Sequence, residues 1–457
     1  MNSQNKPIII LIIVLMALLL CCCLCVLAGG VAVVTRTLSS PNGPVQLPEL
    51  PFLPGNTPTA ASATESQDTA AEFVQIEEQV STLRGLTLDT PLKRESLTSA
   101  QLEEQVTTEF FKDYTPEEAA QDATTFSLLG LLPKDFDLLS FYKQLYAEQI
   151  AGYYDNETKA MYVVADKGFG GMERSTYAHE FTHALQDANY NFETGLGYSD
   201  AACKQNSEYC AAIQALIEGD ATYTQLAWMN QYATKQDMQD LQSFYATYKS
   251  PILDSAPAYM QDDMNFAYTQ GNNFVKAILA SSGDGAVTTA FTTQRPVSTE
   301  QILHPSRYPD DKPLKVALPE MAADLGGTWK EIDRESIGEW YTWLILARAN
   351  NDNYRQIESL VSVATEGWGG DQYVVLNDGK ESAFIVKYQW DTEKDSEEAY
   401  KAFLTYTQLR FGTQDSVDIA CRDGYCSSLM KNPDQGFTWI VSSSRDAVST
   451  LQSSAVK

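Results

Sequence analysis

The sequence predicts an α+β protein, in which a mainly helical domain with a small β-sheet precedes a smaller α+β domain. Three observations predict this class. Apolar residues recur at helical spacing in several segments, such as residues 211–232. Residues 151–164 place aromatic and β-branched runs around a polar centre, which is typical of a β-hairpin. Strand-like runs return at residues 373–376 and 383–390, which favours a second sheet.

Composition restricts the function of the chain. Its 457 residues include 60 acidic and 32 basic side chains, which gives a formal charge of −28. Binding to nucleic acid is excluded as a main function, because a phosphate backbone requires a basic surface. The same charge favours a neutral or basic substrate over a strongly acidic one.

The N-terminal segment is uncharged and apolar from Ile8 to Val34, with a lysine before it and an arginine after it. At about 1.5 Å per residue, a helix of this length exceeds the ~30 Å hydrocarbon core of a bilayer. We therefore predict that residues 1–35 form a transmembrane anchor. A cleaved signal segment, with residues 26–28 as the cleavage site, is the alternative. The flanking charges predict a single-pass cell-membrane protein with its catalytic domain outside the cytoplasm.

Three further segments follow the anchor. Residues 36–72 are rich in Pro, Ser and Thr, which predicts a disordered linker. Residues 73–335 are assigned to the mainly helical domain. Residues 336–457 are assigned to the C-terminal α+β domain, which has its own strand-like runs and a helical pattern at residues 396–411.

Four cysteines outside the apolar run form two close pairs, Cys203/Cys210 and Cys421/Cys426. An even number of cysteines in local pairs predicts two short disulfide loops and an oxidising compartment. Metal binding is the alternative. The first pair is too widely spaced for a zinc knuckle, and the second has no nearby pair to complete one.

The motif His179-Glu180-Phe181-Thr182-His183 carries the clearest chemistry. Histidines four residues apart lie on one face of a helix and can hold a zinc ion together. Glu180 is then beside the metal and can take a proton from water. Coincidence on an ordinary helix is the alternative, but the chain contains only three histidines.

A catalytic zinc ion needs a third protein ligand and an open position. The residues after His183 contain no histidine at the spacing of the extended His-x-x-Gly-x-x-His motif, which excludes that arrangement. Glu218 lies at the polar edge of a following apolar helix and is the predicted third ligand. A solvated surface glutamate is the alternative.

His304 is the remaining histidine. Our first assignment is a catalytic donor to the oxyanion or substrate, the second is a structural role, and the third is a metal ligand in place of Glu218. Several tyrosines compete for the donor role: Tyr153, Tyr223, Tyr268 and Tyr308.

Ligating histidines usually donate their second N–H to a carboxylate or a carbonyl group. Asp187 lies one helical turn beyond His183, and Asp220 lies two residues after Glu218. Either aspartate can serve, or each can be an ordinary surface acid.

The chain resembles the gluzincin-type zinc metallopeptidases in its motif, its downstream glutamate and the hairpin ahead of the helix. It also resembles an uncharacterised bacterial family of membrane-anchored zinc peptidases, over about residues 73–308. The segments that carry this second resemblance are His179–Asp187, Ile217–Ala221 and Glu300–Pro305.

These resemblances imply a zincin-like fold, with His179, His183 and Glu218 as zinc ligands and Glu180 as the base. One departure concerns Thr222, which stands where thermolysin-like enzymes often carry an aspartate four residues after the glutamate ligand. The histidines must then be oriented by another group.

The sequence therefore predicts a membrane-anchored zinc peptidase that hydrolyses peptide bonds of a peptide or protein substrate. Zinc and Glu180 together would make a water molecule nucleophilic. By the resemblance, one strand of the hairpin pairs with an extended substrate. Two alternatives remain: a membrane-tethered binding or scaffold protein with an inactive zincin-like domain, and a non-proteolytic zinc hydrolase.

Overall fold

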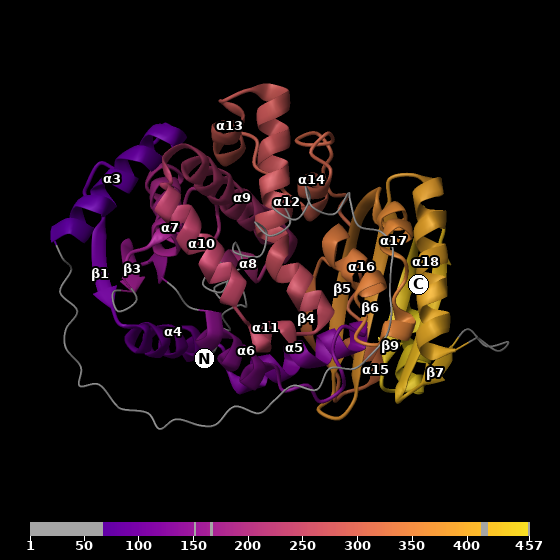
Figure 1. The fold of residues 1–457 in the computed structure, drawn as a ribbon. Helices are drawn as coiled ribbons and strands as arrows, with labels where there is room; N and C mark the ends of the chain where they lie inside the picture. The colour runs from indigo at the N-terminus through magenta and orange to yellow at the C-terminus, as the bar shows by residue number, and fades with distance from the viewer. Residues whose placement is uncertain (1–66, 150–151, 165–167, 413–418, 456–457) are drawn as a thin grey trace, which may run out of the picture.

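The computed structural model describes residues 67–149, 152–164, 168–412 and 419–455 (Figure 1). The predicted anchor at residues 1–35 lies outside these residues, as does most of the predicted linker. Among the helices that the structure describes, none combines the length and the apolar character needed to cross a membrane. Residues 67–72, which the sequence analysis assigned to the linker, form the start of helix α3 (Gln67–Arg84).

The α+β class is confirmed, because the described residues form many helices and two separate sheets. Local sequence explains several helix ends. Helix α5 (Pro116–Leu129), for example, is preceded by a capping box between Thr115 and Glu118 and followed by Gly130 in a left-handed conformation. The other helices of the N-terminal part are α4 (Ser99–Asp113), α6 (Leu138–Gln149), α7 (Gly171–Tyr190), α8 (Asp200–Cys203), α9 (Ser207–Tyr232), α10 (Lys235–Thr247), α11 (Pro251–Asp254), α12 (Ala258–Ser282), α13 (Ala286–Thr292) and α14 (Thr299–Leu303).

The smaller sheet contains β1 (Lys93–Leu97), β2 (Gly152–Asp155) and β3 (Ala160–Val164), in the order β1-β3-β2. Strands β2 and β3 are antiparallel, so the predicted hairpin is confirmed. Strand β1 pairs with β3 in parallel, which leaves β2 at an edge of the sheet. Apolar side chains of α3, α7 and this sheet share one buried cluster, which holds β2 against α7.

The second sheet has the order β4-β5-β6-β9-β8-β7 and lies on the right of Figure 1, in orange and yellow. Successive residues of β6 face opposite sides: Phe384 and Val386 join the main core, whereas Ile385 faces a separate cluster with α19. The elements of this part are α15 (Ala322–Leu325), β4 (Lys330–Glu335), α16 (Gly338–Ala347), η2 (Asp352–Tyr354), α17 (Glu358–Thr365), β5 (Trp368–Asn377), β6 (Ser382–Trp390), α18 (Glu393–Phe411), β7 (Ala420–Arg422), β8 (Tyr425–Asn432), β9 (Gly436–Ser442) and α19 (Arg445–Ala455).

The two parts of the chain share one hydrophobic core, which includes residues of α5, α12, α16, α18 and β9. Polar contacts reinforce the junction at the C-terminal end of α5. Arg410 of α18 donates from Nη1 to the Leu128 carbonyl and from Nη2 to the Ser127 carbonyl, each at 2.8 Å. The Tyr406 hydroxyl donates to the Leu129 carbonyl at 2.7 Å. Helix α18 thus satisfies the last carbonyl groups of α5, which a helix leaves without internal partners.

Both predicted disulfides are present. Cys203 and Cys210 join α8 to the start of α9, with Cα atoms 5.5 Å apart. Cys421 and Cys426 occupy paired positions of the β7–β8 hairpin. The sequence prediction of two short disulfide loops is therefore confirmed.

Candidate metal centre

Helices α7 and α9 build the centre. The four-residue spacing brings both histidines of α7 to one side of that helix, and residues 175–187 of α7 are all buried. Helix α9 packs across this side and contributes Glu218. Helix α12 approaches α9 very closely, because Gly219 and Gly271 meet there without side chains. A Cβ atom on Gly271 would lie 2.0 Å from the Ala215 carbonyl oxygen.

The structure brings the three predicted ligands together. The Nε2 atoms of His179 and His183 are 3.0 Å apart. Glu218 Oε2 lies 3.2 Å from His179 Nε2 and 3.3 Å from His183 Nε2. All three side chains are buried.

This triangle of donor atoms fits a zinc ion. Nitrogen and oxygen ligands lie about 2.0–2.2 Å from tetrahedral zinc, so neighbouring ligand atoms are about 3.3–3.5 Å apart. The three observed separations are close to that value. The donor set of two imidazoles and one carboxylate is also the one found in several catalytic zinc sites. The residues present therefore fit the metal that the sequence predicts.

In the absence of a metal ion, the electrostatics of the group favour a protonated His183 beside an ionised Glu218. Burial acts to raise the pKa of Glu218, but the two histidines outweigh it and lower that pKa to about 2. Burial acts to lower the pKa of His183, but the Glu218 carboxylate raises it to about 9. A cation at this position is thus stabilised by a buried negative charge. A metal ion would compete with the proton for the same nitrogen.

Glu180 is not one of the three grouped ligand residues, but its charge interacts with all of them, and its side chain also contacts the small sheet. Its Oε2 atom accepts a hydrogen bond from the backbone N–H of Tyr154 in the edge strand β2, at 3.0 Å. Burial raises the pKa of Glu180 above its ordinary value, although the neighbouring histidines act in the opposite direction. A raised pKa makes this carboxylate a better proton acceptor than an exposed glutamate.

A pocket of roughly 120 Å³ opens beside Glu180. Its lining is mainly apolar and comes from β3, α7 and the α10 region, including Met161, Met172 and Phe244. Three glutamates also line the pocket, Glu148, Glu173 and Glu180, and each already accepts a hydrogen bond from a backbone N–H group. Glu173 accepts one from Gly170, and Glu148 accepts two at the start of α11. The pocket therefore suits an apolar side chain.

The two aspartates proposed as partners of the histidines have different roles. Asp187 accepts hydrogen bonds from the Tyr154 hydroxyl at 2.9 Å and from the Phe192 N–H at 3.0 Å, and none of its described contacts involves a histidine. Asp220 reaches His183 only through Gln186. The sequence analysis missed Gln186. Its position three residues after His183, on the same helical face, was the available signal.

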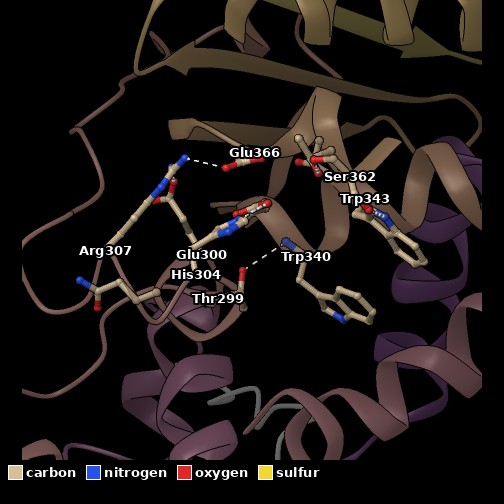
Figure 2. Close-up of polar contacts among 12 residues, drawn as sticks. Thr299, Glu300, His304, Arg307, Trp340, Trp343, Ser362 and Glu366 are labelled. Carbon is tan, nitrogen blue, oxygen red and sulfur yellow. Dashed lines mark hydrogen bonds and ion pairs between the residues drawn. The ribbon is translucent and has the colours of Figure 1, made fainter. Parts of the chain in front are cut away.

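The structure does not bring His304 to the metal group. Figure 2 shows His304 beside Glu300 and Arg307 instead. His304 caps the C-terminal end of α14, and its Nε2 atom lies 2.9 Å from Oε1 of Glu339 in α16. Arg307 is nearby and contacts Glu300 at 3.1 Å and Glu366 at 3.3 Å. The geometry thus favours the second assignment, a structural histidine, over the oxyanion donor. Helical spacing could not reveal this, because the pairing joins distant parts of the chain.

Of the four tyrosines named from the sequence, Tyr268 lies at the metal group. Its ring stacks on that of His179 with centroids 6.0 Å apart. Its hydroxyl is buried and has no hydrogen-bond partner of ordinary geometry among the described residues. Burial, and then the carboxylates of Glu218 and Glu180, raise the pKa of Tyr268 well above its ordinary value. The hydroxyl therefore stays protonated and can donate. By contrast, Tyr153 and Tyr308 bond to Gln105 and Gln294, and Tyr223 is exposed.

Two buried glutamates between α9, α14 and α16 make stability dependent on pH. Burial is the main cause that raises the pKa of Glu208 to about 8 and that of Glu300 to about 9. The folded state holds these protons, whereas the unfolded chain releases them near pH 4.5. We therefore expect the thermal unfolding midpoint to fall as the pH rises from 5 to 9. Glu208→Gln should flatten this dependence, and the exposed Glu193→Gln should not.

An unchanged slope in Glu208→Gln would contradict this assignment. The measurement is a series of thermal unfolding curves at fixed ionic strength, because surface charges also contribute through salt-dependent repulsion.

Comparisons with known proteins cover part of the chain. A family model described as a domain of unknown function (DUF8575) matches residues 327–449, which include all six strands of the second sheet. No curated protein matches the chain. A solved structure from Chloroflexus aurantiacus, described as a "putative hydrolase with a novel fold", is 17% identical to it. That match covers 55% of this chain and 90% of the other, with a TM-score of 0.34. A similarity this low indicates neither the fold nor the reaction of this chain.

Proposed function

We propose that this protein is a zinc-dependent peptidase of zincin-like type. One observation carries the proposal: the donor atoms of His179, His183 and Glu218 converge to separations of 3.0–3.3 Å, with Glu180 next to them in sequence. Two histidines that shared a helical face by chance, or that had only a structural role, would not require a buried carboxylate beside them. The fourth coordination position that a hydrolase requires is left for water or substrate.

The chain's own residues divide the work of peptide hydrolysis. Zinc, when bound, supplies a Lewis acid that polarises the substrate carbonyl and makes a water molecule more acidic. Glu180 accepts the proton from the attacking water and passes it to the leaving amine. The neutral hydroxyl of Tyr268 donates a hydrogen bond to the negative charge that develops on the carbonyl oxygen. Burial strengthens this donor, because water does not compete with it.

The neighbourhood of Glu180 favours a peptide over other substrates. Strand β2 lies at the edge of its sheet, directly beside the catalytic helix, so an extended peptide can be added along it. The apolar pocket beside Glu180 can hold one bulky side chain of such a peptide. We propose membrane anchoring through residues 1–35 as well, with the metal centre on the extracytoplasmic side.

Digestion of a random peptide library tests this function. We expect the zinc-loaded protein to cleave peptides beside a bulky apolar residue, to lose this activity with a chelator, and to regain it when zinc is added. A zinc-binding protein that leaves every peptide intact would be the scaffold or the non-proteolytic hydrolase. A protein that binds no zinc would exclude the peptidase and the zinc hydrolase, and would leave the scaffold protein.

A further inference from the structure

The two histidines of the centre are oriented differently. His183 Nδ1 lies 2.9 Å from Gln186 Oε1. His179 Nδ1, in contrast, is buried without a hydrogen-bond partner among the described residues. Zinc ligation through Nε2 requires that Nδ1 carries the proton, and a fixed acceptor at Nδ1 ensures this. His183 is therefore the ligand whose tautomer is set by the surrounding protein.

The orientation of the Gln186 amide follows from its other contacts. Its Nε2 group lies 2.7 Å from Asp220 Oδ2 and 3.0 Å from the Ile217 carbonyl oxygen, and both of these atoms only accept hydrogen bonds. Nε2 must therefore be the NH₂ group, which directs Oε1 toward His183. A rotated amide would place its oxygen against two acceptors inside a buried site.

Asp220 is itself held in place by a cation. Its carboxylate contacts Nε of Arg84 at 2.8 Å, and the arginine side chain is 10% exposed. Burial acts to lower the pKa of Arg84, but Asp220 raises it, so the guanidinium stays charged. A series of hydrogen bonds thus runs from Arg84 in α3, through Asp220 in α9 and Gln186 in α7, to the ring of His183.

We propose that Gln186, held by Asp220 and Arg84, is the positioning residue that fixes the tautomer and orientation of His183 for metal binding. This inference rests on the proposed function and deepens it. It also supplies the orienting group that Thr222 does not provide. The acceptor at His183 is a neutral amide. The negative charge lies on Asp220, which contacts Gln186 and reaches His183 through it. Arg84 balances this charge.

Three variants test this role. Gln186→Met removes the acceptor at nearly constant size, and Asp220→Asn removes the charge that orients the amide. Gln225→Met is the matched control, because Gln225 is an equally buried glutamine that joins α9 to Ser175 of α7 without contacting a histidine. Zinc affinity is measured by competition with a chelator. We expect about 10- to 100-fold weaker binding in Gln186→Met, a smaller loss in Asp220→Asn, and less than about a twofold change in the control.

Imidazole NMR separates positioning from a general structural effect. The chain has only three histidines, so ¹⁵N-histidine spectra of the zinc-loaded protein should be simple to assign. We expect one hydrogen-bonded Nδ1–H signal in the wild type and in Gln225→Met, and its shift or loss in Gln186→Met. Wild-type zinc affinity and an unchanged signal in folded Gln186→Met would overturn the inference.

Three further outcomes also decide the matter. If Gln186→Met does not fold, Asp220→Asn decides by the same two measurements, because it preserves side-chain shape. If the wild-type protein binds no zinc, the proposed function fails, and this inference fails with it. Zinc binding in the wild type and in folded Gln186→Met with equal affinity rejects the role of Gln186 alone.

Discussion

Replacement of Glu180 by glutamine is expected to lower the rate of peptide hydrolysis by about 10²- to 10⁴-fold, because general acid–base catalysis contributes a factor of this size. Zinc content should not change, since Glu180 accepts the Tyr154 N–H and is not one of the three grouped ligand residues. Glutamine can still accept the hydrogen bond from the Tyr154 N–H, so the local structure should persist. Steady-state kinetics and metal analysis of the same preparation give both quantities.

Glu218→Ala is the comparison for this experiment. It removes a ligand atom that lies 3.2 and 3.3 Å from the two histidine nitrogens, so zinc affinity itself should fall. Activity should then return partly at high zinc concentration, whereas that of Glu180→Gln should not. Wild-type zinc affinity in Glu218→Ala would remove this glutamate from the centre. Loss of zinc in Glu180→Gln would contradict its role as the base.

Replacement of Gly271 by alanine is expected to destabilise the protein by about 3 kcal/mol and to weaken zinc binding. Overpacking of a core typically costs about 1–3 kcal/mol. Here the new Cβ atom meets backbone atoms of α9, including the Ala215 carbonyl oxygen at 2.0 Å, which cannot move aside as a side chain can. A gain in helix propensity of about 1 kcal/mol offsets only part of this cost. Denaturant unfolding measures the first effect, and chelator competition measures the second.

Gly285→Ala provides the control for the helix contact. An added Cβ atom there meets no atom within 4 Å, and the residue lies at the start of α13. We expect a change of at most about 0.5 kcal/mol and no change in zinc affinity. If Gly271→Ala is equally mild, helices α9 and α12 must be able to separate without disturbing Glu218 or Tyr268.

Local patterns predicted much of the fold, because local interactions determine those features. The hairpin of β2 and β3, the disulfide pairs and the two histidines on one helical face each depend on residues close together in sequence. Strands β5 and β6 were also expected within about five residues at each end, since continuous apolar runs mark a sheet that is buried on both faces. Strands β4, β7 and β8 were not expected, because they are short, polar or at the edge.

Long-range contacts explain what the sequence analysis missed. The role of Glu339 as the partner of His304 depends on a contact across 35 residues of sequence. The relation between Gln186 and Arg84 depends on helix α3, whose first residues have the composition of the preceding linker. Glu218 could be predicted because a catalytic zinc ion requires a third protein ligand. This chemical requirement limited the candidate residues more than any local sequence pattern did.

Because α18 contacts the end of α5 and both belong to the shared core, we expect the two parts of the chain to unfold together. Without Arg410 and Tyr406, the carbonyl groups of residues 127–129 would be left without these partners at the boundary of the shared core. Loss of the second sheet would therefore loosen the helices that carry the metal ligands. A substitution that destabilises β9 can then reduce the amount of active protein without any change in the chemistry of the metal centre. Natural selection on the activity of the centre therefore acts also on residues of the distant sheet.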